Sequence, residues 1–247
     1  MLKDATLIMI SGWGHPASSL EPLAQRIRDR ASAGIGQTVT LAAADLTLSE
    51  ETPGGFLPGF LARLREASPP VLLAGWSLGA LIALEAAAEL QERLTGLMLL
   101  SGTACFCTRP DYPFGVVPAR LKAMIAALRC DPAPVVRRFV EDLLGPGAPD
   151  AKARGQDILA TGSESLIAQL HYLREKDLRA KAAAVQCPVL LLHGRQDPII
   201  PIGAGEWLAA HCSSARGVFW EDAGHDLPGQ FIDRSALVIA DFLESLS

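Results

Sequence analysis

One serine lies in a sequence pattern typical of nucleophiles. Residues 75–79 read Gly-Trp-Ser-Leu-Gly, a G-x-S-x-G motif between the apolar run 71–74 and the apolar segment 80–84. A sharp strand-to-helix turn exposes the serine Oγ, and small residues two positions before and after it let strand and helix approach closely. The partial positive charge of the helix N-terminus favours a developing anion. The pentapeptide alone is weak, but its strand–turn–helix setting favours Ser77 as a nucleophile over a chance match.

A possible base and acid follow Ser77 in the chain. A serine nucleophile needs a general base, and the base needs an orienting acid. Asp197 comes just after the apolar run 189–193, and His225 lies in Ala-Gly-His-Asp after the last apolar run. The order Ser, Asp, His accompanies this type of serine motif. We therefore expect Ser77, Asp197 and His225 to converge at the carboxyl edge of a parallel sheet.

Other acidic residues offer alternatives to Asp197 at this stage. Asp197 itself precedes a proline and could simply begin a turn. Asp45 also ends a predicted strand, but it precedes the serine and is interpreted as a turn cap. Asp222 and Asp226 flank His225 and could compete for its ring.

The remaining histidines are weaker candidates than His225. His15 follows the first predicted strand and is the second choice for a site residue. His193 is expected to make a structural hydrogen bond at a strand end. His171 and His211 are interpreted as ordinary helix positions.

A glycine-rich loop is expected to complete an oxyanion hole. One donor should be the backbone N–H of Leu78, directly after the nucleophile. The second should come from residues 11–15, Ser-Gly-Trp-Gly-His, where glycines let the backbone approach a substrate closely. We expect Trp13 N–H to be this donor. The alternative is a plain glycine-rich turn.

These residues require an alternating α/β framework. Near-continuous apolar runs indicate parallel strands that are covered on both faces. The predicted strands are Thr6–Ser11, Val39–Ala44, Val71–Gly75, Gly96–Ser101, Val189–His193 and Gly217–Glu221. The predicted helices between and after them are Leu20–Ala31, Leu57–Glu66, Leu78–Leu90, Gly203–His211 and Phe231–Leu246. We predict about six mostly parallel strands flanked by helices.

One interval interrupts the alternation of strands and helices. Residues 104–186 contain no convincing strand and read as helices punctuated by prolines. An insertion after a strand lies over the sheet edge where open α/β sheets bind ligands. We therefore predict a core of residues 1–103 and 187–247 with a helical lid, 104–186, inserted into it.

These motifs together resemble a known superfamily. The segments Gly-Trp-Gly at 12–14, Gly-Trp-Ser-Leu-Gly at 75–79, Gly-x-x-Asp at 194–197 and Ala-Gly-His at 223–225 resemble the α/β-hydrolase superfamily along nearly the whole chain. More closely, the chain looks like the BioH-type pimeloyl-[acyl-carrier protein] methyl ester esterases of biotin synthesis. The pointers are Trp76 before the serine, the Gly-Trp-Gly loop, Ser101-x-x-x-Cys105-Phe106 and the Arg137-Arg138-Phe139 segment. Ser11 departs from the pattern, in which histidine usually opens the oxyanion loop.

The resemblance implies a reaction, an acyl site and a partner. The reaction would be hydrolysis of the methyl ester of pimeloyl-carrier protein through an acyl-enzyme, with release of methanol and no metal or organic cofactor. Trp13, Trp76, Leu78 and Phe139 would line the acyl site. The lid arginines Arg137 and Arg138 would meet the acidic acyl carrier protein. A small-molecule esterase or thioesterase is the alternative, followed by a non-catalytic binder on the same scaffold.

Composition bounds the remaining possibilities. The 247 residues suit one α/β domain, and a net charge of −5 disfavours general nucleic-acid binding. The five cysteines are odd in number and indicate reduced thiols. No signal peptide and no apolar stretch of about 20 residues is present, so we expect a cytoplasmic protein without a membrane span. We further expect a monomer.

Charge is unevenly distributed between the two predicted parts. Residues 104–186 hold 12 Lys/Arg and 9 Asp/Glu, a net of +3, so the remainder holds 10 and 18, a net of −8. This excess favours an acidic macromolecule docking on the lid. A solvated lid surface of mixed sign explains the modest excess equally well.

Overall fold

A computed structural model describes residues 2, 4–31, 34–46, 57–67, 69–90 and 93–246, with only the backbone of 57–59. It contains a six-stranded sheet in the order β2-β1-β3-β4-β5-β6, in which every neighbouring pair is parallel. The strands are β1 Ala5–Ile10, β2 Ile35–Leu41, β3 Val71–Trp76, β4 Leu94–Leu100, β5 Val189–Gly194 and β6 Ala215–Trp220. The predicted α/β fold with six parallel strands is confirmed.

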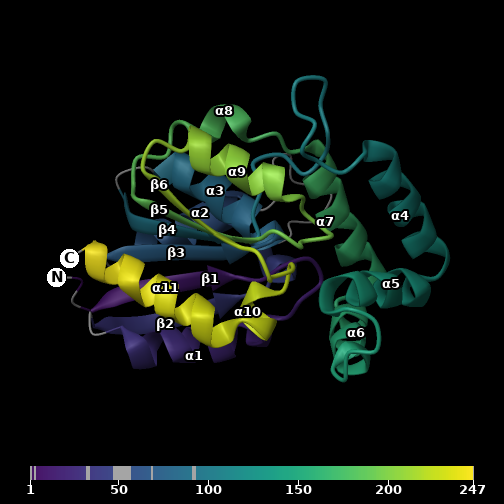
Figure 1. Cartoon of the computed structure of the whole chain (residues 1–247), viewed down its shortest axis with the longest axis horizontal. Helices are drawn as coiled ribbons and strands as arrows, with labels where there is room; N and C mark the ends of the chain where they lie inside the picture. The colour runs from purple at the N-terminus through teal and green to yellow at the C-terminus, as the bar shows by residue number, and fades with distance from the viewer. Residues whose placement is uncertain are drawn as a thin grey trace.

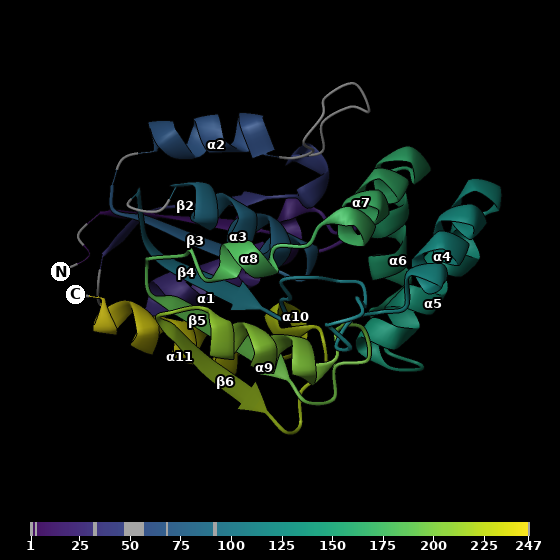
Figure 2. The same cartoon turned by 90° about the horizontal axis from the view of Figure 1, so that it is seen from above.

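Helices cover both faces of this sheet (Figures 1 and 2). On one face α1 packs against α11, and their apolar residues share a core with β1 and β3. On the other face α3 packs on β3 and β4, α9 packs on β5 and β6, and α2 packs on α3. The bounds are α1 Glu21–Arg30, α2 Leu57–Glu66, α3 Leu78–Leu90, α9 Ile202–His211, α10 Leu227–Gln230 and α11 Ile232–Ser245.

Coverage on both faces explains why most strands were visible as apolar runs. Every residue of β1, β3 and β5 is buried. The second strand differs, because β2 lies at the sheet edge and several of its residues are exposed. Its true range therefore begins earlier than the predicted Val39–Ala44, at polar positions that an apolar run does not detect. The last predicted residues, Ala43 and Ala44, belong instead to the short 3₁₀ helix η2, Ala43–Leu46.

A helical insertion lies between β4 and β5. Helices α4 to α7 gather beyond the carboxyl ends of the strands, whereas α8 returns to pack on α3 (Figures 1 and 2). Their bounds are α4 Pro118–Cys130, α5 Pro132–Leu144, α6 Ala151–Ala160, α7 Ser163–Glu175 and α8 Arg179–Ala182. The insertion thus stands over the edge at which the site residues were expected. In the part of the chain described, no helix has the length and apolar character needed to cross a membrane.

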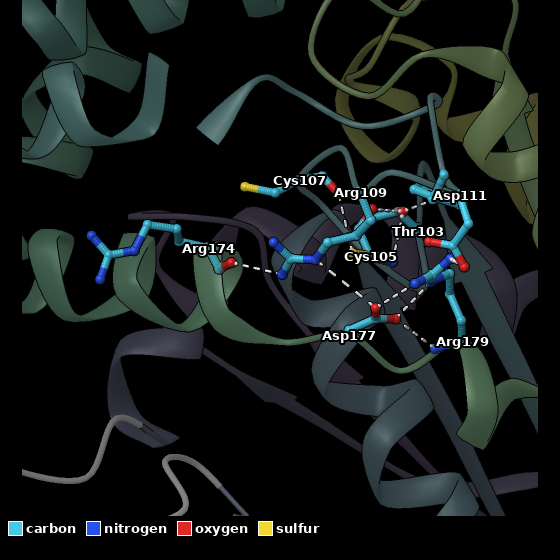
Figure 3. A network of polar contacts seen from close by, with 9 residues as sticks. Thr103, Cys105, Cys107, Arg109, Asp111, Arg174, Asp177 and Arg179 are labelled. Atoms are coloured by element: carbon cyan, nitrogen blue, oxygen red, sulfur yellow. Dashed lines mark hydrogen bonds and ion pairs between the residues drawn. The ribbon is translucent and has the colours of Figure 1, made fainter. Parts of the chain in front are cut away.

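Polar contacts join the two connections of the insertion to each other (Figure 3). Asp177, after α7, accepts two hydrogen bonds from the Arg179 side chain and one from its backbone N–H. It also lies 3.9 Å from Arg109 Nε, in the connection between β4 and α4. Arg179 also pairs with Asp111 at 2.9 Å, and Arg109 donates to the carbonyl of Arg174. These contacts hold the two connections of the insertion together.

Candidate active site

The serine occupies a strained turn between β3 and α3. Ser77 has a φ of 57°, in the left-handed region that a non-glycine residue rarely adopts. Two glycines make this turn possible because neighbouring backbone fills the space where a Cβ would lie. At Gly75 a Cβ would overlap the carbonyl of Gly79, and at Gly79 it would overlap the carbonyl of Ile10 in β1. The turn therefore holds Ser77 at the carboxyl edge of the sheet, between β1 and β4.

A continuous hydrogen-bonded chain runs from Ser77 to a buried carboxylate. Ser77 Oγ lies 2.8 Å from His225 Nε2, and His225 Nδ1 lies 2.6 Å from Asp197 Oδ2. The carbonyl of His225 accepts hydrogen bonds from Trp76 Nε1 at 3.0 Å and Ser101 Oγ at 2.9 Å. Both the ring and the backbone of His225 are thus held. The three predicted residues meet in the geometry of a nucleophile, a base and an orienting acid.

The environment of Asp197 keeps its carboxyl group ionised. Burial alone would raise the pKa of Asp197, but the charge of His225 and hydrogen bonds from His193 and His225 outweigh it and hold the pKa well below its usual range. Its other oxygen accepts backbone N–H bonds from Ile199 and Ile200, both at 2.8 Å. A fixed anion therefore faces His225 Nδ1.

The competing acids have other partners. Asp222 pairs with Arg234 at 2.7 Å, and Asp45 is exposed on the η2 turn. Asp226 turns away from the His225 ring: its Oδ1 caps α10 through Gly229 N, and its Oδ2 lies 3.5 Å from Arg154 of α6. Burial raises the pKa of Asp226, and Arg154 opposes this effect. The geometry favours Asp197 as the partner of His225.

The loop after β1 lies directly against Ser77. A Cβ built on Gly12 would be 3.3 Å from Ser77 Cβ. Ser11 Oγ donates to the carbonyl of His15 at 2.7 Å, which closes the loop on itself. This serine therefore has a structural use at the position where the family pattern has histidine. Because β1 and β3 are neighbours, the loop lies at the switch point of the strand order, where open α/β sheets form crevices.

An apolar pocket of about 370 Å³ extends from Ser77 into the insertion. Trp13 and Phe139 lie in its wall with their rings 4.8 Å apart, edge to face. The other apolar lining side chains come from α4, α5, α7, the connection before α4 and the loop after Asp197. They are Leu121, Met124, Pro134, Val135, Leu170, Leu173, Phe106, Val116, Pro198 and Ile199. Three charged residues, Arg120, Arg138 and Asp142, also line it. Such a pocket suits an acyl chain whose reacting carbonyl sits at Ser77.

Trp76 and Leu78, which were predicted to line the acyl site, lie outside the pocket lining. Trp76 is buried behind the serine, where it bonds the His225 carbonyl and packs on the His15 ring at 4.6 Å, and it is outside the pocket lining. The Leu78 side chain is also buried outside the lining, so only its backbone could serve the site. Arg137 is exposed on α5, and Arg138 reaches Asp142 at 3.1 Å.

Two features of the site were not predicted from the sequence. His193 Nε2 lies 3.3 Å from the same Asp197 oxygen that contacts His225. Arg154 of the insertion pairs with Asp226, and this contact joins the insertion to the loop that carries His225. The position of His193 four residues before Asp197, at the end of β5, was the only available signal for the first contact. Nothing in the sequence marked Arg154. Among the described residues, no cluster of three or more His, Cys, Asp or Glu side chains could hold a metal ion.

Comparison with known proteins places these features in a family. Residues 7–240 match the model of the "Alpha/beta hydrolase family". Among curated proteins, the chain is 31% identical over 245 residues to a pimeloyl-[acyl-carrier protein] methyl ester esterase of Nitrosomonas europaea, covering 92% of each chain. A protein of the same name from Aromatoleum aromaticum is 30% identical over 236 residues, covering 89% of this chain and 90% of the relative.

Solved structures agree on the fold. An esterase from Exiguobacterium antarcticum superposes with a TM-score of 0.85 and 18% identity, covering 99% of this chain and 93% of that one. A hydrolase from Pseudomonas aeruginosa gives a TM-score of 0.80 at 21% identity, covering 97% and 90%. At these identities the likeness concerns the fold alone.

Proposed function

Since this chain belongs to the alpha/beta hydrolase family and is an esterase of that family, we propose that it hydrolyses the methyl ester of pimeloyl-[acyl-carrier protein] with Ser77 as nucleophile. The observation that carries the chemistry is the unbroken chain Ser77–His225–Asp197, with links of 2.8 and 2.6 Å, at the end of an apolar pocket. The identity of the substrate is inferred from the names of the relatives given above, from the apolar lining of the pocket and from the charge of the insertion.

The first half of the proposed reaction forms an acyl-enzyme. Ser77 Oγ attacks the ester carbonyl carbon while His225 Nε2 takes the hydroxyl proton. The oxyanion is stabilised by the backbone N–H groups of Leu78 and Trp13. His225 then gives the proton to the methoxy oxygen as the C–O bond breaks, and methanol leaves. Asp197 orients the ring and stabilises its positive charge.

The second half regenerates the enzyme. His225 accepts a proton from a water molecule, whose oxygen attacks the acyl-serine carbonyl. The tetrahedral intermediate collapses, and His225 returns the proton to Ser77 Oγ. The products are methanol and the pimeloyl carboxylic acid still attached to its carrier. The protons of both halves pass between His225, Ser77, the substrate and this water molecule.

The charge and position of the insertion favour a substrate that is bound to a carrier protein. It holds the excess of positive charge, +3 against −8 for the remainder, and it forms most of the pocket wall. Arg138 belongs both to the pocket lining and to α5, and Arg137 beside it is exposed. In this proposal residues 104–186 act as a lid on which an acidic carrier protein docks. Electrostatic complementarity of this kind speeds association.

Labelling with a fluorophosphonate probe tests the nucleophile. The wild-type protein should be labelled, and Ser77→Ala should not be, because the probe forms its bond with the activated serine oxygen. Thermal unfolding of both proteins is the control for folding. Equal labelling of the two would refute the role of Ser77.

Two further measurements test the substrate. The protein should restore growth without biotin to a bacterial strain lacking its pimeloyl ester esterase, and Ser77→Ala should not. Turnover of methyl pimeloyl-carrier protein should exceed that of short p-nitrophenyl esters in kcat/KM. The reverse preference, together with no rescue, would identify a small-molecule esterase instead.

A further inference from the structure

A second histidine contacts the acid of the proposed triad. His193, at the end of β5, is buried with 1% of its surface exposed. Its Nε2 lies 3.3 Å from Asp197 Oδ2, the oxygen that His225 Nδ1 approaches to 2.6 Å. The same Nε2 lies 2.9 Å from the carbonyl oxygen of Ile200. One carboxylate oxygen thus faces two imidazole rings, one from the end of β5 and one from the loop after β6.

The partners of His193 determine its tautomer. The carbonyl of Ile200 can only accept a hydrogen bond, and so can the ionised Asp197 carboxylate. His193 Nε2 must therefore carry the proton, which it donates to the Ile200 carbonyl while lying 3.3 Å from Asp197 Oδ2. Its Nδ1 is buried without a hydrogen-bond partner in the described structure, which suits a nitrogen without a proton.

Close packing holds the ring in this orientation. A Cβ built on Gly205 of α9 would lie 2.6 Å from His193 Nδ1, so the helix passes directly against the ring. Ile200 and Asp197 hold the opposite ring edge. The donor is therefore fixed before any substrate binds, which is the requirement for preorganised electrostatics.

We propose that His193 is a positioning residue for the ester hydrolysis proposed above. The Nε2–H edge of its ring, 3.3 Å from Asp197 Oδ2, holds that carboxylate in place and takes up part of the negative charge that otherwise acts on His225. His193 thereby limits how strongly His225 holds a proton, and it keeps His225 available as a base. This inference rests on the proposed Ser77–His225–Asp197 mechanism.

Other charged groups near His225 set the background for this effect. Asp197 faces it from the loop after β5, and His15 interacts with it from the loop after β1. Asp226 follows it in the chain, with Arg154 of α6 beside that carboxylate. None of these groups contacts His193 except Asp197, so a substitution at position 193 reports on the shared oxygen.

Two variants test the proposal. His193→Phe keeps an aromatic ring and removes the donor, whereas His193→Gln keeps an N–H donor at similar reach. For His193→Phe we expect the acid limb of the kcat/KM profile to move up by roughly 0.5 to 1 pH, because the whole Asp197 charge then favours the imidazolium. We also expect kcat to fall by about ten-fold with KM little changed, since substrate contacts remain. His193→Gln should restore both quantities toward wild type.

The outcomes separate positioning from packing. Wild-type acid limbs and kcat in both variants would show that His193 only fills space. Equal losses in Phe and Gln variants would also overturn the proposal, because Gln retains the donor. Nitrogen-15 NMR of the wild-type protein gives a test that needs no variant: the His193 ring should be the Nε2–H tautomer, and an Nδ1–H tautomer would refute the inference. Fluorophosphonate labelling that persists in Ser77→Ala would refute the proposed function while leaving the tautomer result intact.

Discussion

His15 shows how a single buried side chain can make stability depend on pH. It is 1% exposed, its Nδ1 donates to the Trp13 carbonyl at 2.9 Å, and its Nε2 has no partner among the described groups. Burial, followed by the nearby Arg154 charge, lowers the pKa of His15 from 6.5 to about 3. Between pH 6.5 and about pH 3, the folded protein therefore keeps this ring neutral, whereas the unfolded chain protonates it.

We predict that His15 reduces stability in weak acid. Because the pKa of His15 is depressed in the folded state, its contribution is fully present above pH 6.5 and is lost as the pH falls toward about 3. Between about pH 7 and about pH 5 the loss should be roughly 2 kcal/mol in the free energy of unfolding. Urea denaturation at several pH values measures it. His15→Asn keeps a donor for Trp13 and does not titrate, so its stability should fall less over this range. Parallel curves for the two proteins would contradict the prediction.

At the scale of elements, the turn between β3 and α3 depends on backbone contact rather than on side chains. The start of α3 passes so close to β1 that a Cβ at Gly79 would overlap the Ile10 carbonyl. That carbonyl belongs to a fully buried central strand, so it has little freedom to move. The conformation of Ser77 thus depends on how two elements from distant parts of the sequence pack together.

Replacing Gly79 with alanine should damage this turn. We expect Gly79→Ala to cost at least about 1 to 3 kcal/mol of unfolding free energy through overpacking, and to lower esterase activity. Gly155→Ala is the matched control, because in α6 its Cβ would meet only Val136, at 4.0 Å. This control should gain about 0.5 to 1 kcal/mol, the usual effect of Gly to Ala inside a helix. Urea denaturation midpoints measure the stability of both variants. A Gly79→Ala midpoint close to that of the wild type would show that the turn between β3 and α3 tolerates a Cβ.

At the scale of the whole molecule, the reactive groups and the proposed partner surface belong to different layers. Ser77, Asp197 and His225 follow strands of the sheet, whereas the pocket wall and the excess positive charge belong to the insertion. The ion pairs Arg154–Asp226 and Lys176–Glu85 connect the two layers. In the proposed function, the sheet layer carries out the chemistry and the insertion selects the substrate.

The proposed docking predicts an effect of charge that depends on substrate size. We expect Arg137→Glu to lower kcat/KM for methyl pimeloyl-carrier protein by roughly 2- to 10-fold at low ionic strength, because a rim charge mainly affects association. Turnover of a p-nitrophenyl ester should not change, since Arg137 is exposed and outside the pocket lining. Added salt should shrink the difference from wild type.

The control for this prediction is an arginine outside the insertion. Arg63 is an exposed arginine of α2, outside the insertion, and Arg63→Glu makes the same change in net charge. It should leave carrier-protein turnover close to wild type. Equal losses in the Arg63 and Arg137 variants would point to net charge alone and exclude a docking role for α5.

Local sequence determined the chemistry of this protein. The Gly-Trp-Ser-Leu-Gly motif, with a strand before it and a helix after it, needs only neighbouring residues to be recognised, and parallel strands bring their carboxyl ends to one edge. The buried strands and the extent of α2 and α3 also follow from local patterns. By contrast, the predicted bounds of the edge strand β2 were wrong. This strand is partly exposed, so its residues do not form a continuous apolar run.

Tertiary structure decided which groups meet. His225 contacts Asp197 across 28 residues and Ser77 across 148, and no local pattern separates Asp197 from Asp222 or Asp226. The shared oxygen at His193, the burial of His15 and the turning of Trp76 toward the His225 carbonyl depend likewise on contacts between distant loops. Residue type and spacing indicate which chemistry a side chain can perform, but its protonation state and its partner depend on burial and distance. These quantities exist only once the chain has packed.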